Sequence, residues 1–416
     1  MADHVGSLSA DSTRANGTQR DSRIPAVIGI EPWSWPGDDN SGNMIHAAAA
    51  RRILTKYREV KPTLQWTDEK IEQLRAEHSH IVYVTANLIR LGVPRDHPSI
   101  KELVASHVTL ANNIERAALP VVVFGLGSQA PLAGPYEFNV APETIRLLKV
   151  LSDHSRRMAV RGAFTADTCI RLGINNVEVI GCQSIFWHRS PQFSWRLSEP
   201  GRDHAGNIAC NFTDARSEAE LIRQAMACGY DVIGQGNGGE EELRQHEPGE
   251  AAAAGLRFGW DFELAFEKGL IDRGQYERWA RDHFYQFRRP EAWLDHMQRY
   301  CFCYGTRLHG NMAAMIAGTR ALWIVHDMRT KEVCDHFKLP RVELDEVQGG
   351  VNLEALFERA DYSGCRQIYP ERYRVLFEYV DRANLPHSLP APIAATATQN
   401  REVSPGPSAA AGDAAP

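Results

Sequence analysis

Arg307 and His309, two residues apart, are the side chains whose types and spacing point most directly to chemistry. They lie in a Gly-broken turn between an apolar run, residues 301–304, and a helix of small residues expected from about residue 311 to Gly318. The unpaired N–H groups at a helix start favour an anion, a guanidinium forms paired hydrogen bonds to phosphate or carboxylate, and an imidazole titrates near neutral pH. The segment therefore predicts a phosphate or carboxylate site with a titratable group beside it.

The elements around this turn are a strand, a helix and a second strand at residues 321–325, which is the repeating unit of a parallel sheet. Ligands of such sheets bind where strands end and helices begin. Arg161 ends another predicted strand and Arg329 follows the strand 321–325, so both are expected near Arg307. A structural ion pair is the alternative role for Arg161, and a backbone hydrogen bond at the helix start is the alternative for His309.

A glycine-rich loop follows the apolar run at residues 121–124. Its glycines, Gly125 and Gly127, let a backbone approach a ligand closely, and Ser128 and Gln129 offer hydrogen bonds. No third glycine opens the next helix at the spacing of the dinucleotide fingerprint. The loop is therefore predicted to contact substrate without being a nucleotide motif.

A second polar loop follows the strand predicted at residues 24–30 and precedes a helix expected at about residues 44–57. Asp38, Asp39 and Asn43 in this loop are candidate substrate contacts, although turn formation alone would also explain them. Trp33 and Trp35 point to the same side of an extended segment, which suits either sugar stacking or ordinary packing.

Composition limits the classes of protein. The chain has 416 residues, 43% of them hydrophobic, and a formal net charge of -6, so a large core is expected and nucleic acid is not an expected partner. No apolar run approaches the ~18 residues of a spanning helix, and the first twenty residues lack a signal-peptide core. The eight cysteines lack metal-site spacing. We expect a cytoplasmic protein with free thiols and no metal; peripheral membrane contact stays open.

Strand, loop and helix alternate in both halves, which predicts an α/β protein of two Rossmann-like parallel-sheet domains facing a cleft. The non-periodic stretch 189–206 is the expected boundary. The predicted parts are disordered ends at 1–23 and 386–416, an N-terminal domain at 24–195, a C-terminal domain at 205–345 with a helical insertion at about 240–290, and a helical closure at 346–385.

Five motifs stand in order along the chain: Gly125-Leu126-Gly127-Ser128-Gln129, Val160-Arg161-Gly162 with Thr165, Gly181-Cys182-Gln183-Ser184-Ile185-Phe186, Gly305-Thr306-Arg307-Leu308-His309-Gly310, and Asp327-Met328-Arg329. In order and approximate spacing they resemble the polysaccharide pyruvyl transferases, over roughly residues 25–345. The segment Asn40-Ser41-Gly42-Asn43 is similar to that family's Asn-x-Gly-Asp turn, with Asn43 where an Asp is usual.

The resemblance implies a fold like the B-type glycosyltransferases, with the acceptor on the side of the domain 24–195 and the donor on the side of the domain 205–345. It also implies an enzyme of exopolysaccharide biosynthesis that needs no cofactor. Such an enzyme moves the pyruvyl group of phosphoenolpyruvate onto two hydroxyls of a carbohydrate acceptor, free or lipid-linked, as a cyclic ketal. Arg307, Arg161 and Arg329 would hold the donor anions and His309 would protonate the methylene carbon, while Asp38 or Asp39 would act as base. The expected substrate-binding set also includes Gly125, Gly127, Ser128, Gln129, Asn43 and Gly310.

Two other classes stay open at this stage. A two-domain cleft also serves nucleotide-sugar glycosyltransferases and epimerases, which would hold a diphosphate with the second-domain loops. The acidic run Glu240-Glu241-Glu242 argues against an anion there. A non-catalytic sugar-binding protein of polysaccharide assembly is the other class, and the pairing of Arg307 and Arg161 with His309 argues against it.

Overall fold

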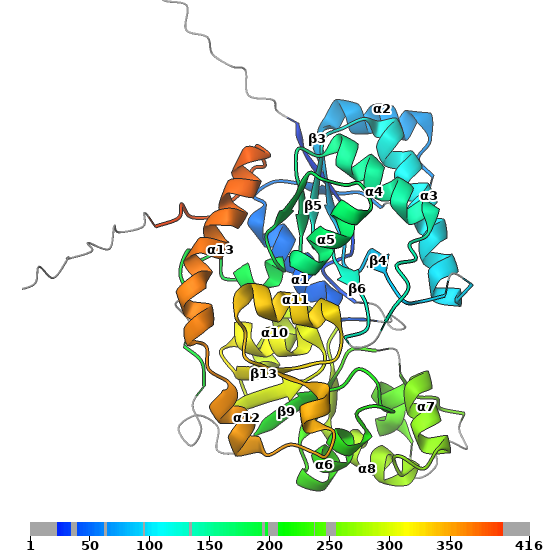
Figure 1. The fold of residues 1–416 in the computed structure, drawn as a ribbon, viewed down its shortest axis with the longest axis vertical. Coiled ribbons are helices and arrows are strands. Elements are labelled where there is room, and N and C mark those ends of the chain that lie inside the picture. The colour runs from blue at the N-terminus through cyan, green and yellow to red at the C-terminus, as the bar shows by residue number, and fades with distance from the viewer. Residues whose placement is uncertain are drawn as a thin grey trace, which may run out of the picture.

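The computed structural model describes residues 23–34, 40–61, 65–94, 96–132, 135–193, 196–198, 207–236, 238–246 and 255–393. Asp38, Asp39 and Trp35 lie outside these residues, and so do residues 1–22 and 394–416 of the segments 1–23 and 386–416 that were predicted to be disordered. The molecule has an N-terminal and a C-terminal α/β domain stacked along its long axis (Figure 1).

The N-terminal domain is built on a parallel sheet whose strands run in the order β2 (Arg58–Glu59), β1 (Ile24–Gly29), β3 (His78–Val84) and β5 (Val121–Phe124). A parallel bridge between Leu126 and Val160 continues it to β7 (Met158–Val160) and β8 (Val177–Val179). A short pair, β4 (Ile89–Arg90) and β6 (Ser128–Gln129), extends past the strand ends.

Side-chain alternation along these strands decides which helices cover each face. Val82, Val84 and Phe124 pack with helix α1 (Asn43–Ile53) on the face toward the second domain. Ile81 and Tyr83 face the opposite way, with α2 (Asp68–Glu77), α3 (Pro98–Ala117), α4 (Pro142–His154) and α5 (Ala163–Arg171). Both faces are thus buried, as apolar strands in a parallel sheet require.

The C-terminal domain holds six parallel strands in the order β11 (Phe284–Gln286), β10 (Asp231–Gly234), β9 (Ile208–Asn211), β12 (Phe302–Gly305), β13 (Arg320–Val325) and β14 (Arg341–Glu343). Its helices are α6 (Ala219–Cys228), α7 (Trp260–Glu267), α8 (Arg273–His283), α9 (Pro290–Met297), α10 (Leu308–Ala317), α11 (Met328–Phe337) and α12 (Leu353–Arg359). These two parallel sheets confirm the predicted α/β fold class.

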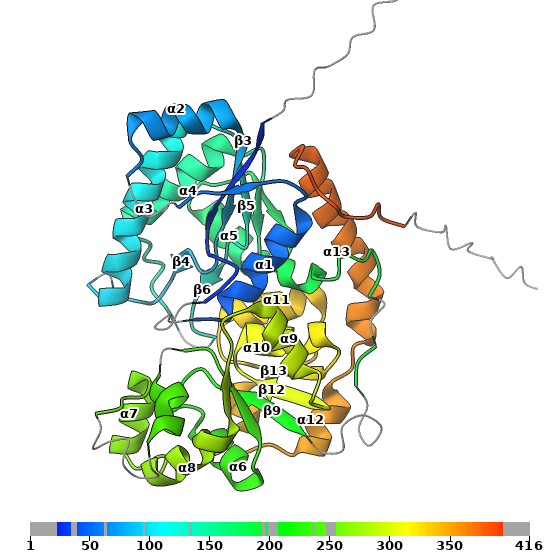
Figure 2. The same cartoon turned by 180° about the vertical axis from the view of Figure 1, so that it is seen from behind.

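Helix α13 (Ser363–Arg382) leaves the C-terminal domain and runs back along the N-terminal one (Figures 1 and 2). The Tyr379 hydroxyl donates to the main-chain oxygen of Val123 at 2.9 Å, and the Val123 N–H donates to the same hydroxyl at 3.2 Å. One hydrophobic cluster contains residues of α1, α10 and α13, so the interface between the domains is itself a core.

Three predicted boundaries differ from the structure. The helix expected at about residues 44–57 is α1, which ends at Ile53. Helix α10 begins at Leu308 rather than near residue 311, because Gly310 does not break the helix and instead packs closely against Gln235 and Asn211. The predicted tail starts at Pro386, whereas residues 386–393 return to α1: the Thr55 N–H donates to the Pro386 oxygen at 2.8 Å, and Leu389 is buried.

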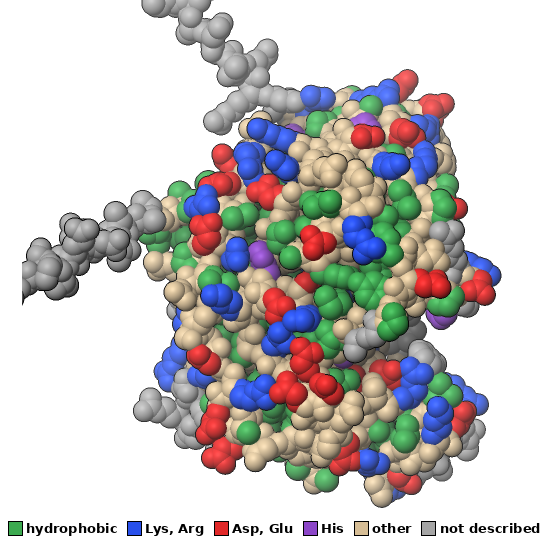
Figure 3. All heavy atoms as spheres, viewed as in Figure 1, with side chains coloured by type: hydrophobic (Ala, Val, Ile, Leu, Met, Phe, Trp, Pro, Cys, Tyr) green, Lys and Arg blue, Asp and Glu red, His purple; other side chains and the backbone are tan. Residues whose placement is uncertain are grey.

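Charged side chains of both signs are intermixed on the face shown in Figure 3. Among the described residues, none of the helices combines the length and the apolar character that crossing a bilayer needs.

Candidate active site

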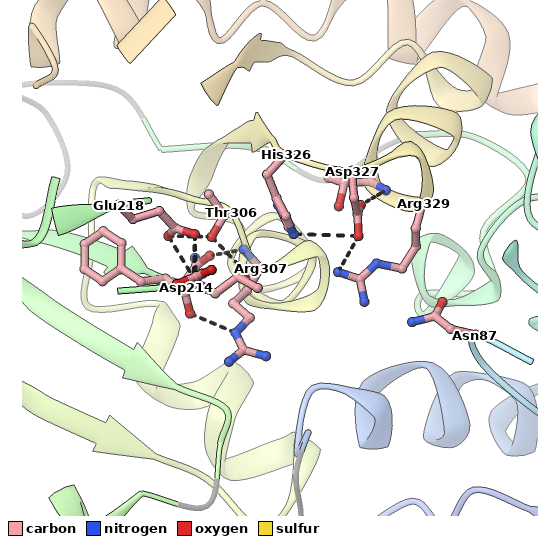
Figure 4. A network of polar contacts seen from close by, with 12 residues as sticks. Asn87, Asp214, Glu218, Thr306, Arg307, His326, Asp327 and Arg329 are labelled. Atoms are coloured by element: carbon pink, nitrogen blue, oxygen red, sulfur yellow. Dashed lines mark hydrogen bonds and ion pairs between the residues drawn. The ribbon is translucent and has the colours of Figure 1, made fainter. Parts of the chain in front are cut away.

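The main cavity, about 810 Å³ in volume, lies between the domains. Most of its wall comes from the N-terminal domain, including Trp33, Asn43, Asn87 and Gln129. Arg307 and Arg329 close it from the C-terminal domain, and their guanidinium groups point into the same space with Asn87 across from them (Figure 4). The structure therefore brings together Arg307 and Arg329, as expected from the two strand ends.

Arg307 is held so that its outer nitrogens face this space. Its main-chain N–H donates to Asn211 Oδ1 and its Nε donates to the Phe212 oxygen, both at 2.8 Å. Arg307 is also the N-cap of α10 and makes no side-chain capping hydrogen bond. The first-turn N–H groups of α10 are consequently left for a ligand, which favours an anion there.

Other helix starts around the cavity are capped by carboxylates of the protein. Thr165 in the first turn of α5 donates its N–H to Glu332 Oε2 at 2.9 Å. Thr330 in α11 donates its N–H to Asp327 Oδ1 at 2.8 Å. Helix α1 differs from α10, because the main-chain oxygens of Asn40, Ser41 and Gly42 accept from its first three N–H groups. The start of α10 is thus the place where an anionic group fits best.

Arg161 is 1% exposed and keeps unused donors. Its NH1 donates to Asn87 Oδ1 at 3.2 Å, whereas its Nε and NH2 find no hydrogen-bond partner within the described chain. Gly127 makes room for this side chain, because a Cβ there would come within 3.0 Å of Arg161 Cδ. A buried guanidinium with unpaired N–H groups is costly unless an anion completes it.

His309 stacks on His46 of α1, with ring centroids 5.2 Å apart and an angle of 11° between the planes. Its Nε2 lies 3.6 Å from Cys182 Sγ. Burial, and then the charges of Arg161 and Arg329, hold the pKa of His309 well below its usual range. Without a bound anion, His309 is therefore a neutral imidazole, because burial and two cations oppose its protonation. The sequence, by contrast, predicts an acid with a pKa near neutral.

Gln183 fixes the tautomer of His46. The Gln183 Nε2 lies 3.1 Å from the main-chain oxygen of His46, which can only accept, and 2.9 Å from His46 Nδ1. The amide nitrogen must therefore face His46, so Nδ1 accepts and the ring proton sits on Nε2. Gly125 permits this approach, since a Cβ there would lie 3.2 Å from His46 Nδ1 and 3.3 Å from Gln183 Nε2. His46 thus stays neutral beside His309.

The remaining sequence candidates fall in different places. Asn43 and Gln129 line the main cavity. Ser128 is fully buried, and its N–H donates to Thr165 Oγ1 at 2.8 Å, so it supports the loop from behind. Gly310 lies against Gln235.

Sequence reasoning missed His46, Gln183 and Asn87 as site residues. Gln183 belongs to a motif that carried the family resemblance, and that motif was the available signal for it. His46 and Asn87 stand in no motif. The approach of the two domains places His46 against His309, and a contact within the N-terminal domain places Asn87 beside Arg161.

Buried neutral histidines predict acid sensitivity of the fold. Burial lowers the pKa of His107 and His326 to about 4 and that of His336 to about 3, and it also lowers those of His46 and His309. An unfolded chain binds these protons below pH 6.5 and the folded chain does not, so stability is present above that pH and falls as the pH is lowered from about 6.5 to 4. The melting temperature should fall steadily over this window; a constant value would contradict these burial effects.

The two stacked sheets and the arginine-lined cavity between them define a two-domain parallel α/β protein. A family model described as polysaccharide pyruvyl transferase matches residues 40–328, and the chain belongs to that family. No curated protein sequence gave a significant match.

Three solved structures match this chain over most of its length, at low identity and low TM-score. Anabaena Alr3699/HepE, in complex with UDP and glucose, is 11% identical with a TM-score of 0.43, covering 87% of this chain and 99% of that one. The S. aureus MnaA–UDP structure is 8% identical with a TM-score of 0.40, covering 89% and 100%. The glycosyltransferase SnogD from Streptomyces nogalater is 12% identical with a TM-score of 0.34, covering 87% and 98%.

Proposed function

We propose that the protein transfers the pyruvyl group of phosphoenolpyruvate to two hydroxyls of a saccharide and forms a cyclic ketal. The observation that carries this proposal is the pair Arg307 and Arg329 in the wall of the interdomain cavity. The buried Arg161 supports it, because its charge, like that of Arg329, acts on His309. Phosphoenolpyruvate brings a phosphate and a carboxylate, and several guanidinium groups suit both because each can bind an oxyanion through two hydrogen bonds.

Donor binding would complete the unpaired groups of the site. One anionic group would accept from Arg161 Nε and NH2, which lack partners among the described residues, and the other from Arg307 and the first turn of α10. Arg329 is held in place by Asp327, whose Oδ2 lies 3.2 Å from its NH2, and adds positive charge. The donor then neutralises the cations that depress the pKa of His309.

The chemistry follows from that change of charge. His309 gains a proton once the anions are bound and gives it to the methylene carbon, which becomes the methyl group of the ketal. The first hydroxyl adds to the central carbon and loses its proton to a base. The C–O bond to phosphate then breaks, and the second hydroxyl closes the ring. Of the two hydroxyl protons, one returns to His309 and one leaves with inorganic phosphate, so atoms and charge balance.

The acceptor would lie in the remainder of the main cavity. Trp33 is 37% exposed and lines it, so its ring is available for stacking on a sugar. Asn43 and Gln129 supply hydrogen-bonding groups nearby. Asp38 and Asp39 remain our proposal for the base, because the loop that carries them joins Trp33 to Asn43.

Proton uptake is the sharpest test of the role given to His309. At pH 8, where phosphoenolpyruvate is fully ionised, binding should be accompanied by uptake of a fraction of a proton per site, because the bound anions offset the charges of Arg161 and Arg329 and so raise the pKa of the imidazole. Calorimetric titration in buffers of different ionisation enthalpy measures this number. The uptake should vanish in His309→Gln. Binding without proton uptake in the unsubstituted protein would contradict the proposed coupling.

A nucleotide-sugar enzyme is the second candidate, and the acidic run no longer bears on it as the sequence suggested. Glu240 is buried and accepts from the Tyr276 hydroxyl at 2.9 Å, and burial raises its pKa to about 7. Glu241 pairs with Arg288. Calorimetry with phosphoenolpyruvate and with uridine diphosphate glucose separates the two functions: donor binding by phosphoenolpyruvate alone supports pyruvyl transfer, and binding of the nucleotide sugar alone overturns it.

A non-catalytic sugar-binding protein would bind glycans without consuming the donor. Release of inorganic phosphate from phosphoenolpyruvate, dependent on an added glycan acceptor pool, distinguishes the enzyme from such a binder. The methyl singlet that a pyruvate ketal adds to the glycan NMR spectrum identifies the product.

A further inference from the structure

A second cavity, about 510 Å³ in volume, lies within the C-terminal domain at the ends of β9, β10 and β11. Thr213 and Arg307 line both this cavity and the main one, so the two spaces meet at Arg307. The donor proposed above occupies the main cavity, which leaves this adjoining space without a ligand.

Aromatic rings and amides make up much of the lining. The rings belong to Phe212, Phe262, Tyr276 and Phe284, and the amides to Gln235 and Gln286. Flat apolar surfaces combined with a few convergent hydrogen-bonding groups suit a sugar ring, which presents C–H faces and hydroxyl edges. The volume falls within the usual range for small-ligand pockets, ~300–1,000 Å³.

The loop after β9 offers no free amides to a phosphate. The N–H groups of Thr213 and Asp214 donate to Oε2 and Oε1 of Glu218, respectively, both at 3.0 Å. The Ala215 N–H donates to Asp261 Oδ2 at 2.9 Å, and the Arg216 N–H donates to Asp214 Oδ1 at 3.0 Å. Four successive amides that could bind a diphosphate in a loop of this kind are thus occupied by the protein's own carboxylates (Figure 4 shows Asp214 and Glu218).

The charges that line the second cavity also favour a neutral ligand. Among its lining residues in the described ranges, Arg307 is the single cation, and it serves the main cavity as well. The Asp214 carboxylate is bound by Arg216 through two contacts of 2.9 and 2.6 Å. Asp261 remains as a carboxylate that a diphosphate would have to approach.

Gln235, in the wall of the second cavity, keeps an unused hydrogen-bond donor. The side chain is 3% exposed, lines the second cavity, and its Nε2 lacks a hydrogen-bond acceptor within the described residues. A Cβ on Gly310 would lie 2.7 Å from this nitrogen, so the amide sits against the first turn of α10, next to His309. A hydroxyl oxygen would complete it.

We propose that the C-terminal cavity is a saccharide subsite that binds a neutral sugar unit of the acceptor, next to the unit that receives the pyruvyl group. The inference rests on the proposed function for the role of this sugar, whereas its binding can be measured alone. Acceptors with at least two sugar units would then be preferred over monosaccharides.

Gly236 offers a way to block the cavity without disturbing the fold. It lines the space, and a Cβ built there meets no atom within 4 Å. Gly349 is the matched control, since its Cβ also meets nothing within 4 Å and it lies by a separate surface hollow. The Gly236→Leu and Gly349→Leu variants therefore make the same chemical change at two sites.

The experiment is saturation-transfer NMR on the full chain, with methyl glycosides of glucose, galactose and mannose as probes and UDP as the anionic rival. We expect at least one glycoside to bind, to lose roughly tenfold or more in affinity in Gly236→Leu, and to be unaffected in Gly349→Leu. Absence of glycoside binding, or binding insensitive to Gly236→Leu, overturns the subsite. UDP binding that Gly236→Leu abolishes overturns it in favour of a nucleotide.

Calorimetry with phosphoenolpyruvate on the same three proteins separates this inference from the proposed function. Donor binding should be equal in all three. Failure of the unsubstituted protein to bind phosphoenolpyruvate defeats the pyruvyl transfer proposal and leaves the glycoside result standing; donor binding together with failure of the glycoside arm defeats the subsite alone.

Discussion

His309→Ala is expected to lower the rate of ketal formation by roughly 10²–10⁴-fold, the usual contribution of a positioned acid. Binding of phosphoenolpyruvate should change little, because the arginines and the start of α10 hold the donor in this proposal. Single-turnover phosphate release and a donor titration on the same preparation measure the two quantities.

The matched control is His154→Ala, at the C-terminal end of α4 and away from both cavities. This variant should keep full activity. Full activity in His309→Ala would eliminate the imidazole as the acid. Loss of donor binding in that variant would instead show that His309 helps to bind the donor.

Arg307→Ala is expected to weaken binding of phosphoenolpyruvate by roughly 10–100-fold, since hydrogen bonds to charged groups contribute about 1.5–3 kcal/mol. The main-chain hydrogen bond from Arg307 to Asn211 survives the substitution, so α10 should keep its start. Calorimetric titration gives the dissociation constant directly.

Arg278→Ala serves as the control for the loss of one positive charge, because Arg278 is exposed on α8 and outside both cavities. Its donor affinity should equal that of the unsubstituted protein. An unchanged dissociation constant in Arg307→Ala would show that Arg307 does not bind the donor. An equal loss of donor affinity in Arg278→Ala would show that the effect of Arg307→Ala comes from the overall charge of the protein.

The parallel α/β fold was predictable because apolar runs, glycine-rich loops and helical periods repeat along the chain, and these local patterns determine strands and helices. The convergence of Arg307 and Arg329 was predictable for a related reason: both follow neighbouring strands, β12 and β13, whose ends meet at one sheet edge.

Contacts between the domains could not be predicted in the same way. The stacking of His309 on His46 joins α10 to α1 across 263 residues of sequence (309 minus 46), and no local pattern encodes it. The lowered pKa of His309 follows from that burial and from two arginines on other elements. The helix start was predicted too late in the chain because glycine usually breaks a helix. Here Gly310 lies inside α10, where the absence of a side chain lets Gln235 pack closely against it.

Helix α13 has a consequence for how the protein would take up and release its ligands. Tyr379 ties this helix to both main-chain hydrogen-bonding groups of Val123 in β5. On the other side of the molecule, α3 lines the main cavity and α7 lines the second one (Figure 1). Any relative rotation of the domains must then pivot near α13. A rotation about that pivot would separate α3 from α7, and the glycan of the proposed reaction would then enter and leave from that side.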